Sequence, residues 1–192
     1  MKDVYNLSDG QLITLYLEGD NKSIETLIFR HQNKVFTSIY LLVKDKYIAD
    51  DIFQETFIKA IDTLRSGRYA DEGKFLQWVL RISHNLCVDY FRKKSRTPII
   101  RTNDEQDVFE VLKFEEPNAE ENLIRREEKE HVKKLLDLIP QDQREVIILR
   151  HFANLTFKEI ASITDCSINT ALGRMRYGLF NLRRLIGEKQ VA

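Results

Sequence analysis

The sequence predicts an all-α protein made of two small helical domains joined by an acidic linker. The 192 residues include only 7 glycines and 3 prolines, fewer than the many turns of a β-sheet protein require. Apolar residues recur at helical spacing in nearly every segment, and we find no segment to assign to a strand. The pattern fails across acidic residues 99–118, so we expect domains at residues 1–98 and 119–192 with a linker between them.

Four helices are expected in the first domain, and the first three follow from capping and periodicity. Ser8 and Gln11 form a capping box that starts the first helix. The second helix is expected from about Asn21 to Val43 and the third from about Tyr47 to Leu64, because apolar residues recur three and four positions apart in both. A loop from Arg65 to Gly73 follows.

The fourth helix is expected from about Lys74 to Lys94 and ends before Pro98, because a proline disfavours a helical residue in front of it. At about 100° per residue, its side chains divide into two faces. One face is apolar and predicts a core: Phe75, Val79, Ile82, Leu86 and Tyr90. The other is basic, polar and aromatic: Lys74, Trp78, Arg81, Asn85 and Arg92.

The second domain begins with a helical pattern that runs from Ala119 to Ile139 and stops at Pro140. Asp142 and Glu145 are spaced as a capping box. We therefore expect them to open a helix that runs through Phe152.

The end of the chain has the layout of a helix-turn-helix motif. A capping box of Thr156 and Glu159 opens a short helix ending at Ile163, and Ser167 caps a last helix that runs to about Ile186. The apolar stripe of the last helix comprises Ile168, Leu172, Met175, Leu179 and Leu182. Its other faces carry residue types that contact bases and phosphates in the major groove: Asn169, Thr170, Gly173, Arg174, Arg176 and Tyr177. A helical hairpin with a solvated polar face would show the same pattern.

Gly173 is unusual inside this helix, because glycine costs roughly 0.5–1 kcal/mol relative to alanine there. Close approach of the backbone to DNA would explain it. Tight packing between helices would explain it equally well.

Charge is unevenly distributed along the chain. The 30 basic and 30 acidic residues give a formal net charge of zero, which by itself argues against nucleic-acid binding. Residues 81–101, however, contain six basic residues against one acidic residue, and residues 103–122 contain eight acidic residues against one basic residue. The net value therefore hides a basic patch next to an acidic connector.

The basic and aromatic face of the fourth helix suits single-stranded or melted nucleic acid, because aromatic rings stack on unpaired bases while cations follow the phosphates. Arg68 and Tyr69 in the preceding loop could complete a pocket for an extruded base. The alternative is that Trp78 belongs to the core and that the charges form a solvated face. The sequence leaves both interpretations open.

Asp51 and Glu55, four residues apart, raise the alternative of a metal-dependent nuclease or phosphohydrolase. No histidine lies within a turn of them, and His84 is on another helix. We therefore expect no catalytic residue, no metal and no cofactor.

Cys87 and Cys166 lie far apart inside helical patterns, as expected of reduced thiols in a cytoplasmic protein. No apolar run approaches the roughly 18 residues of a membrane span, and the start of the chain lacks a signal-peptide pattern. We expect a cytoplasmic protein without membrane insertion.

Taken in order, these motifs resemble the extracytoplasmic-function (ECF) group of the sigma-70 family of RNA polymerase sigma factors. The segments similar to region 2 of that family are residues 49–57 (ADDIFQETF), 75–85 (FLQWVLRISHN) and 89–93 (DYFRK). The segments similar to region 4 are residues 138–140 (LIP), 144–150 (REVIILR) and 156–161 (TFKEIA). The ordered set covers nearly the whole chain, which makes it far more specific than any single motif.

The resemblance implies a factor that directs core RNA polymerase to specific promoters and stabilises promoter melting, without catalysis of its own. Docking on the polymerase β′ clamp helices would involve Asp50, Asp51, Gln54, Glu55 and Phe57. Melting and reading of the minus-ten element would involve Arg65, Arg68, Tyr69, Lys74, Trp78, Arg81, Asn85, Arg92 and Lys93. Reading of the duplex minus-thirty-five element would involve Ser167, Asn169, Thr170, Gly173, Arg174, Arg176 and Tyr177. The acidic linker would pass through the polymerase cleft and RNA exit path, and the β flap and an anti-sigma factor are further implied partners.

The helix-turn-helix departs from many relatives, which have a glycine in the turn and a Val-Lys-Ser-Arg run in the recognition helix. Here the turn contains Asp165-Cys166 and the helix reads NTALGR at residues 169–174. The motif stays intact, but its minus-thirty-five preference does not follow from the family pattern. The alternative function is a stand-alone helix-turn-helix regulator of duplex operators, which leaves the Trp78 face and residues 50–57 without a purpose.

Overall fold

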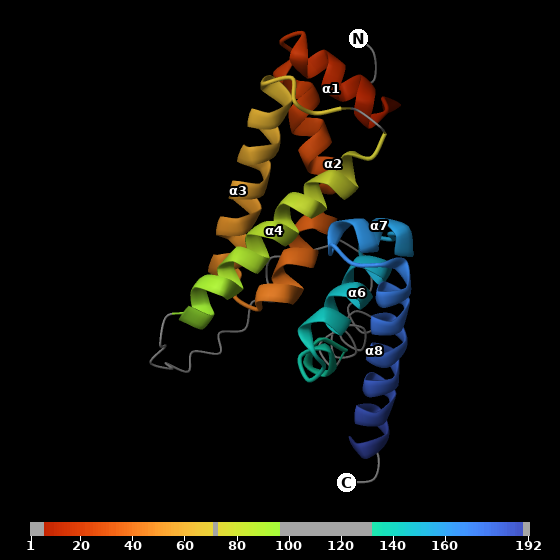
Figure 1. The fold of residues 1–192 in the computed structure, drawn as a ribbon. Coiled ribbons are helices and arrows are strands. Elements are labelled where there is room, and N and C mark those ends of the chain that lie inside the picture. Colours follow the sequence, from red (N-terminus) through yellow and green to blue (C-terminus); the bar gives the residue numbers. More distant parts are fainter. Residues whose placement is uncertain (1–5, 71–72, 97–131, 190–192) are drawn as a thin grey trace, which may run out of the picture.

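The computed structural model describes residues 6–70, 73–96 and 132–189, and every regular element in these ranges is a helix (Figure 1). The all-α prediction is therefore confirmed. The predicted linker at 99–118 and the helical pattern at 119–131 lie outside the described residues. Within the described ranges, no helix is long and apolar enough to cross a membrane.

Four helices form what we call the N-terminal lobe: α1 (Asp9–Leu17), α2 (Asn21–Val43), α3 (Lys46–Arg65) and α4 (Phe75–Arg96). The last three pack against one another, and α1 lies at one end of α2 and α3 (Figure 1). The predicted capping box is confirmed, because the Ser8 hydroxyl accepts a hydrogen bond from the Gln11 N–H and the Gln11 side chain accepts one from the Ser8 N–H. Asp20 and Asp45 cap α2 and α3 with their carboxylates.

Asp9 joins α1 to α2. Its two carboxylate oxygens accept hydrogen bonds from Arg30 at 2.6 Å and from Nε2 of His31 at 2.7 Å, and Arg30 also donates to the Leu7 carbonyl at 2.8 Å. Burial alone would raise the pKa of Asp9, but the hydrogen bonds and charges of His31 and Arg30 outweigh burial and lower this pKa from its ordinary value of 3.8. The network therefore stabilises the docking of α1 on α2 as long as Asp9 is ionised.

The C-terminal lobe comprises residues 132–189, with α6 (Gln141–His151), α7 (Phe157–Ile163) and α8 (Ile168–Lys189). Its apolar core is continuous with that of the N-terminal lobe, because α6 packs against α2 and α7 packs against α4. All residues of α6 from Arg144 to Leu149 are buried. A helix that is buried all round must be covered on opposite sides, here by α8 and by the N-terminal lobe.

The predicted capping box at the start of α6 is wrong. Pro140 is the N-cap residue, and no side chain caps the helix. Asp142 accepts a hydrogen bond from the next backbone N–H, and Glu145 is bound by His84 of the other lobe instead. Pro140 has φ −53° and ψ 144°, a non-helical conformation of the kind that N-cap residues adopt. The helix before Pro140 ends at residue 136 rather than at Ile139.

The apolar stripe predicted for α8 is wrong in part. Ile168 and Leu172 are 46% and 43% exposed. The buried or partly buried face comprises Ala171, Met175, Gly178, Leu182 and Leu185. Alanine and glycine add little hydrophobicity, so a pattern based on large apolar residues is displaced from the true contact face.

Candidate nucleic-acid interface

Trp78 lies at the edge of the core of the N-terminal lobe. Its ring centroid is 4.4 Å from that of Tyr69 and 5.8 Å from that of Phe75. Phe75 is buried, whereas Trp78 and Tyr69 are only partly buried. The Trp78 ring packs on the core and also borders two cavities, so its role in nucleic-acid binding stays a prediction.

The first cavity, which we call the α3–α4 cavity, has a volume of about 430 Å³. This volume is in the range of small-ligand sites. The lining combines an aromatic wall with both hydrogen-bond donors and acceptors: Lys59, Asp62, Thr63, Arg68, Trp78, Ile82, Asn85, Leu86 and Asp89. Donors and acceptors beside an aromatic ring are the groups that recognise the edge and face of an unpaired base.

The end of α3 places Arg68 at this cavity. Gly67 has φ +67°, a left-handed conformation that glycine adopts without strain. The chain therefore reverses, with N–H groups of Gly67 and Arg68 donating to the carbonyls of Leu64 and Thr63 at 3.0 and 3.3 Å. Nε of Arg68 donates to the Ser66 hydroxyl at 2.8 Å, which holds the guanidinium near the loop.

The second cavity, which we call the interlobe cavity, has a volume of about 540 Å³ and lies between the start of α4 and α7. One side carries three cations that the sequence predicts for DNA binding, Arg68, Lys74 and Arg81. The other side belongs to the helix-turn-helix: Thr156, Lys158, Glu159, Ser162 and Ile163.

Glu159 joins the two sides of the interlobe cavity. One of its carboxylate oxygens accepts a hydrogen bond from the Gln77 amide at 2.8 Å, and the other accepts one from the Thr156 N–H at 2.7 Å, which confirms the predicted capping box. Burial would raise the pKa of Glu159, but the hydrogen bonds from Thr156 and Gln77 and the charge of Lys74 lower it. Glu159 is therefore an ionised carboxylate beside a cation of the proposed DNA-binding face.

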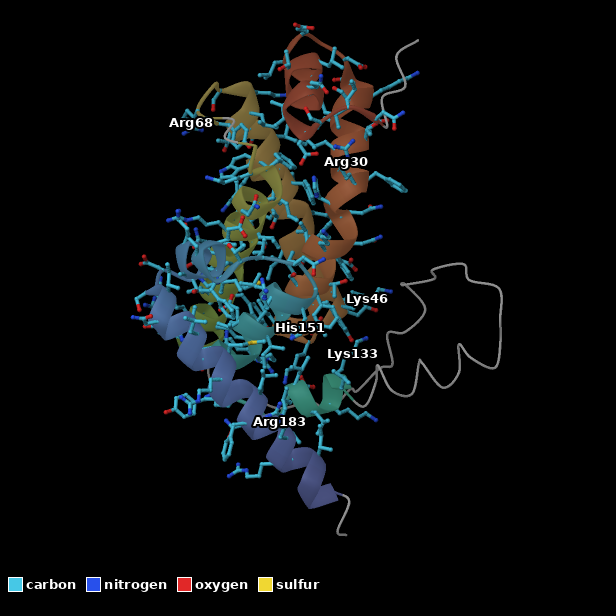
Figure 2. The ribbon with its side chains drawn as sticks, turned by 90° about the vertical axis from the view of Figure 1, so that its right-hand side faces the viewer. Arg30, Lys46, Arg68, Lys133, His151 and Arg183 are labelled. Atoms are coloured by element: carbon cyan, nitrogen blue, oxygen red, sulfur yellow. The ribbon has the colours of Figure 1, made fainter. Side chains whose placement is uncertain are left out.

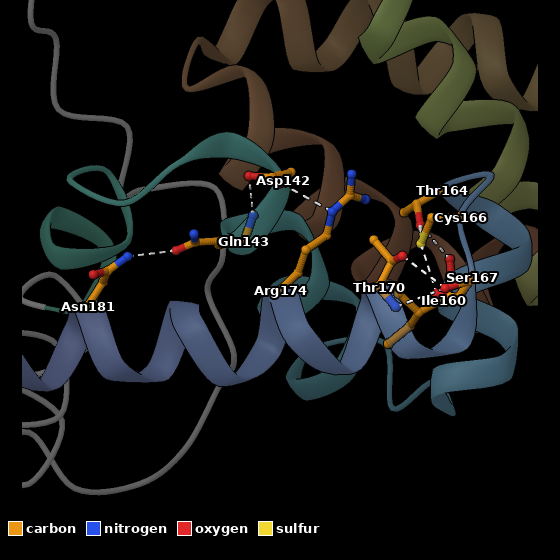
Figure 3. A network of polar contacts seen from close by, with 9 residues as sticks. All are labelled: Asp142, Gln143, Ile160, Thr164, Cys166, Ser167, Thr170, Arg174 and Asn181. Atoms are coloured by element: carbon orange, nitrogen blue, oxygen red, sulfur yellow. Dashed lines mark hydrogen bonds and ion pairs between the residues drawn. The ribbon is translucent and has the colours of Figure 1, made fainter.

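The predicted cap of α8 is confirmed, because the Ser167 hydroxyl accepts a hydrogen bond from the Thr170 N–H at 3.0 Å (Figure 3). Nε of Arg174 lies 3.2 Å from a carboxylate oxygen of Asp142, which attaches α8 to α6 (Figure 3). The remaining predicted contact residues on α8 that are exposed are Asn169, Thr170, Arg176 and Tyr177. They form a polar surface near the start and middle of α8.

The two glycines of α8 in this region differ in their surroundings. A Cβ built on Gly178 would lie 2.8 Å from Cδ1 of Ile147 and 3.3 Å from Cβ of Gln143. A Cβ built on Gly173 would have no heavy atom of a described residue within 4 Å. Tight packing therefore explains Gly178, whereas it does not explain Gly173.

The residues predicted to bind polymerase divide into exposed and buried groups. Asp51, Gln54 and Glu55 are exposed on α3, and Asp50 is partly buried. Phe57 is only 6% exposed, with its ring centroid 4.9 Å from that of Phe53, so it packs in the core rather than on the docking surface.

Asp51 and Glu55, which raised the alternative of a metal-dependent enzyme, are both exposed on α3. Glu55 lies 2.9 Å from Nζ of Lys59. Among the described residues, no three or more His, Cys, Asp or Glu side chains are grouped to hold a metal ion.

Arg65, predicted for the minus-ten surface, is engaged elsewhere in the fold. Its Nε donates to the Tyr16 hydroxyl at 2.6 Å, and its guanidinium lies 5.7 Å from the centre of that ring. Arg92 and Lys93 are exposed near the end of α4, where they continue the basic surface.

The sequence prediction missed Lys59, Asp62 and Asp89, which line the α3–α4 cavity. Asp89 follows Asn85 by four residues, so helical spacing was a usable signal for it. Spacing also relates Lys59 to Asp62, but the sequence does not show which face of α3 meets α4. No sequence signal pairs His84 with Glu145, because that contact depends on how the lobes pack.

Comparison with known proteins gives consistent results. The model of sigma-70 region 2 matches residues 27–97, and the model of sigma-70 region 4 matches residues 130–171. The chain is 32% identical over 190 residues to the ECF RNA polymerase sigma-E factor of Escherichia coli K12, covering 95% of this chain and 94% of that protein. It is 30% identical over 172 residues to the RNA polymerase sigma-H factor of Pseudomonas aeruginosa, covering 87% and 88% of the two chains.

Two solved structures are similar in fold. CnrH in complex with the cytosolic domain of CnrY gives a TM-score of 0.68 at 20% identity, covering 94% of this chain and 97% of CnrH. The sigma factor RpoE in complex with the anti-sigma factor NepR from Bartonella quintana gives a TM-score of 0.63 at 19% identity, covering 86% and 98%. Together with the sequence relatives, these findings show that the chain belongs to the ECF group of the sigma-70 family of RNA polymerase sigma factors.

Proposed function

We propose that this sigma factor, which directs core RNA polymerase to promoters, binds melted minus-ten DNA at α4 and duplex minus-thirty-five DNA at α8. Its mechanism is binding alone, and the protein makes or breaks no covalent bond. The domain boundaries that go with this function are residues 1–98, 99–118 and 119–192. Its place of action is the cytoplasm, where core polymerase and promoter DNA are found.

The observation that carries the proposal is the α3–α4 cavity beside Trp78. The cavity has room for a base, and its wall offers a half-buried indole for stacking. Asn85 supplies an amide that both donates and accepts, while Asp62 and Asp89 accept. Removing a base from the duplex costs a few kcal/mol, which stacking and edge hydrogen bonds in such a cavity would offset.

The exposed face of α8 supports duplex recognition. Asn169 and Arg176 carry side chains that reach base edges and phosphates in the major groove. Gly173 lies between them on the helix, and the absence of a side chain allows the α8 backbone to approach DNA closely.

The exposed surface of α3 supports polymerase docking. Asp51, Gln54 and Glu55 lie within little more than one helical turn and present acceptors to solvent. Ile58, one turn further, is 58% exposed and adds an apolar contact to this surface. By resemblance to the family, this surface of α3 docks on the β′ clamp helices of the polymerase, and the C-terminal lobe docks on the β flap. An anti-sigma factor is a further partner, since both similar structures are complexes and one contains a protein of that name.

The test is run-off transcription with purified core polymerase and genomic fragments of the host. The protein should yield discrete new transcripts, and Trp78→Ala should lose promoter opening. Phe29→Ala is the matched control, because Phe29 is 68% exposed on α2 and lies outside both cavities. The proposal would be contradicted if core polymerase that responds to another sigma factor gave no new transcripts with this protein. The role of α4 would be contradicted if the Trp78→Ala variant opened promoters normally.

A further inference from the structure

His31 lies in the N-terminal lobe between α1 and the start of α4. Its side chain belongs to α2 and is only 9% exposed. On the α1 side, Nε2 of His31 donates to a carboxylate oxygen of Asp9 at 2.7 Å. On the α4 side, the centroid of the imidazole ring lies 5.7 Å from that of Phe75, and the two ring planes are tilted by 44°. His31 therefore joins a carboxylate of α1 to an aromatic ring of α4.

Phe75 extends this contact to the two rings of the proposed single-strand surface. Phe75 is 1% exposed, and its ring centroid lies 5.8 Å from that of Trp78 and 6.3 Å from that of Tyr69. The rings of Trp78 and Tyr69 are themselves 4.4 Å apart. Rings packed in this way hold one another in tilted or edge-to-face orientations. A change in the orientation of Phe75 would therefore move both of the partly buried rings.

The Asp9 carboxylate that binds His31 is held from a second side. Its other oxygen accepts a hydrogen bond from Arg30 at 2.6 Å, and Arg30 also donates to the Leu7 carbonyl at 2.8 Å. Figure 2 shows that Arg30 and Arg68, in the loop before α4, lie at the same end of the N-terminal lobe. A hydrogen bond to a carboxylate that is fixed in this way defines the orientation of the His31 ring.

Packing alone does not require a histidine at position 31. An apolar side chain of similar size would fill the same space without bringing a polar ring into the core, where an unpaired N–H is unfavourable. The hydrogen bond to Asp9 offsets this cost and gives the ring a defined orientation, which an apolar side chain would lack. The histidine therefore adds orientation to packing.

We propose that His31 is a positioning residue for promoter melting. Held by Asp9, its ring sets the orientation of Phe75. Phe75 in turn sets the position of the Trp78 indole, which stacks on an unpaired base. His31 is buried and acts on DNA only through these rings. This inference rests on the proposed function for the ligand of Trp78, but the position of the indole can be measured without DNA.

The first experiment uses the fluorescence of Trp78, the only tryptophan of the sequence, in the full chain without DNA. His31→Phe keeps a ring but removes the hydrogen bond to Asp9, and Asp9→Ala removes the same bond from the other side. We expect both variants to shift the Trp78 emission to longer wavelength and to increase its quenching by acrylamide. The reason is that an indole held less firmly is more accessible to water.

Ile39→Val is the matched control for general loosening of the core. Ile39 is 1% exposed on the same helix, about 12 Å from His31 along the helix axis. Circular dichroism and urea unfolding establish that each variant is folded under the conditions of the fluorescence measurement. An unchanged Trp78 emission in His31→Phe would overturn the proposal, and so would an equal change in Ile39→Val.

The second experiment measures whether His31 acts through Trp78. Binding of a fluorescent single-stranded minus-ten oligonucleotide is followed by anisotropy, with the protein assembled on core polymerase. His31→Phe should weaken binding by about threefold to tenfold, a part of what base stacking contributes. In the Trp78→Ala background the same substitution should have no further effect, because the ring that His31 positions is absent. Equal losses in the two backgrounds, or an equal loss of binding to duplex minus-thirty-five DNA, would overturn the proposal.

The two experiments separate this inference from the proposed function. If the Trp78 emission responds as expected but neither the unmodified protein nor any variant binds the oligonucleotide, the stacking role of Trp78 is contradicted. Positioning of the indole by His31 is still supported in that case. An emission that responds, together with a loss of oligonucleotide binding that requires Trp78, supports the whole inference.

Discussion

Two glycines on α8 predict opposite responses to the same substitution, and the pair tests the structure and the proposed DNA contact together. A Cβ added at Gly173 would meet open space, whereas a Cβ added at Gly178 would be crowded by Ile147 and Gln143. Neither residue has a positive φ, so backbone conformation does not disfavour alanine at either position. The difference between the variants therefore reports packing alone.

The magnitudes follow from two opposing effects. Replacing a helical glycine by alanine stabilises the helix by about 0.5–1 kcal/mol, and this gain applies at both positions. At Gly178 the new methyl displaces Ile147, which is itself buried, and overpacking of this kind costs about 1–3 kcal/mol. We expect Gly173→Ala to raise the free energy of unfolding by about 0.5–1 kcal/mol and Gly178→Ala to lower it by about 1 kcal/mol.

The assay combines urea unfolding with binding of duplex minus-thirty-five DNA from a promoter found by run-off transcription. Gly173→Ala should unfold at higher urea than the unmodified protein and bind duplex more weakly, because the methyl separates the α8 backbone from DNA. A loss of stability in Gly173→Ala would refute the open surroundings of this residue. Higher stability with unchanged duplex binding would refute the close approach and leave the glycine without a DNA-related explanation.

Three further predictions concern buried polar groups. Asp9→Asn should lower the free energy of unfolding by about 1–2 kcal/mol at neutral pH. Because the folded-state pKa of Asp9 is lowered, this difference is present above the ordinary value of 3.8 and disappears as the pH falls through the lowered pKa. Urea unfolding measured across this pH range would show the change. Burial, together with the nearby charge of Glu145, raises the pKa of Cys87 to about 12. At pH 8 a maleimide should therefore modify Cys166 and leave Cys87 unmodified until the protein unfolds. Mass spectrometry would identify the modified cysteine. Arg144→Met should keep or raise stability, since it removes a buried N–H without a partner, and a loss above about 2 kcal/mol would contradict that account.

The N-terminal lobe was predictable because its signals are local. The capping box at Ser8, the bounds of α2 and the two faces of α4 depend on residues within a few turns of one another. Local signals also located the helix-turn-helix, from the caps at Thr156 and Ser167. The all-α class and the family resemblance rest on this same kind of information.

Predictions failed where tertiary contacts decide. Glu145 has the spacing of a capping residue, but His84 of the other lobe binds it instead. The buried face of α8 passes through Ala171 and Gly178, whose small side chains leave almost no hydrophobic signal. Phe57 was placed on the docking surface by its position in a family motif, yet its side chain is needed in the core.

The zero net charge, which at first argues against nucleic-acid binding, comes from residues outside the two lobes, because the described residues of each lobe include four more basic than acidic residues. Each lobe-to-lobe ion pair or hydrogen bond described here sets a carboxylate of the C-terminal lobe against a donor of the N-terminal lobe, as in Lys44 with Asp137 and Gln77 with Glu159. Only Glu159 among these carboxylates lies beside a cation of the predicted minus-ten surface, Lys74. Salt weakens contacts to phosphate and also weakens the pairing that closes the lobes. Binding of promoter DNA should therefore weaken as the salt concentration rises, in spite of the zero net charge of the chain.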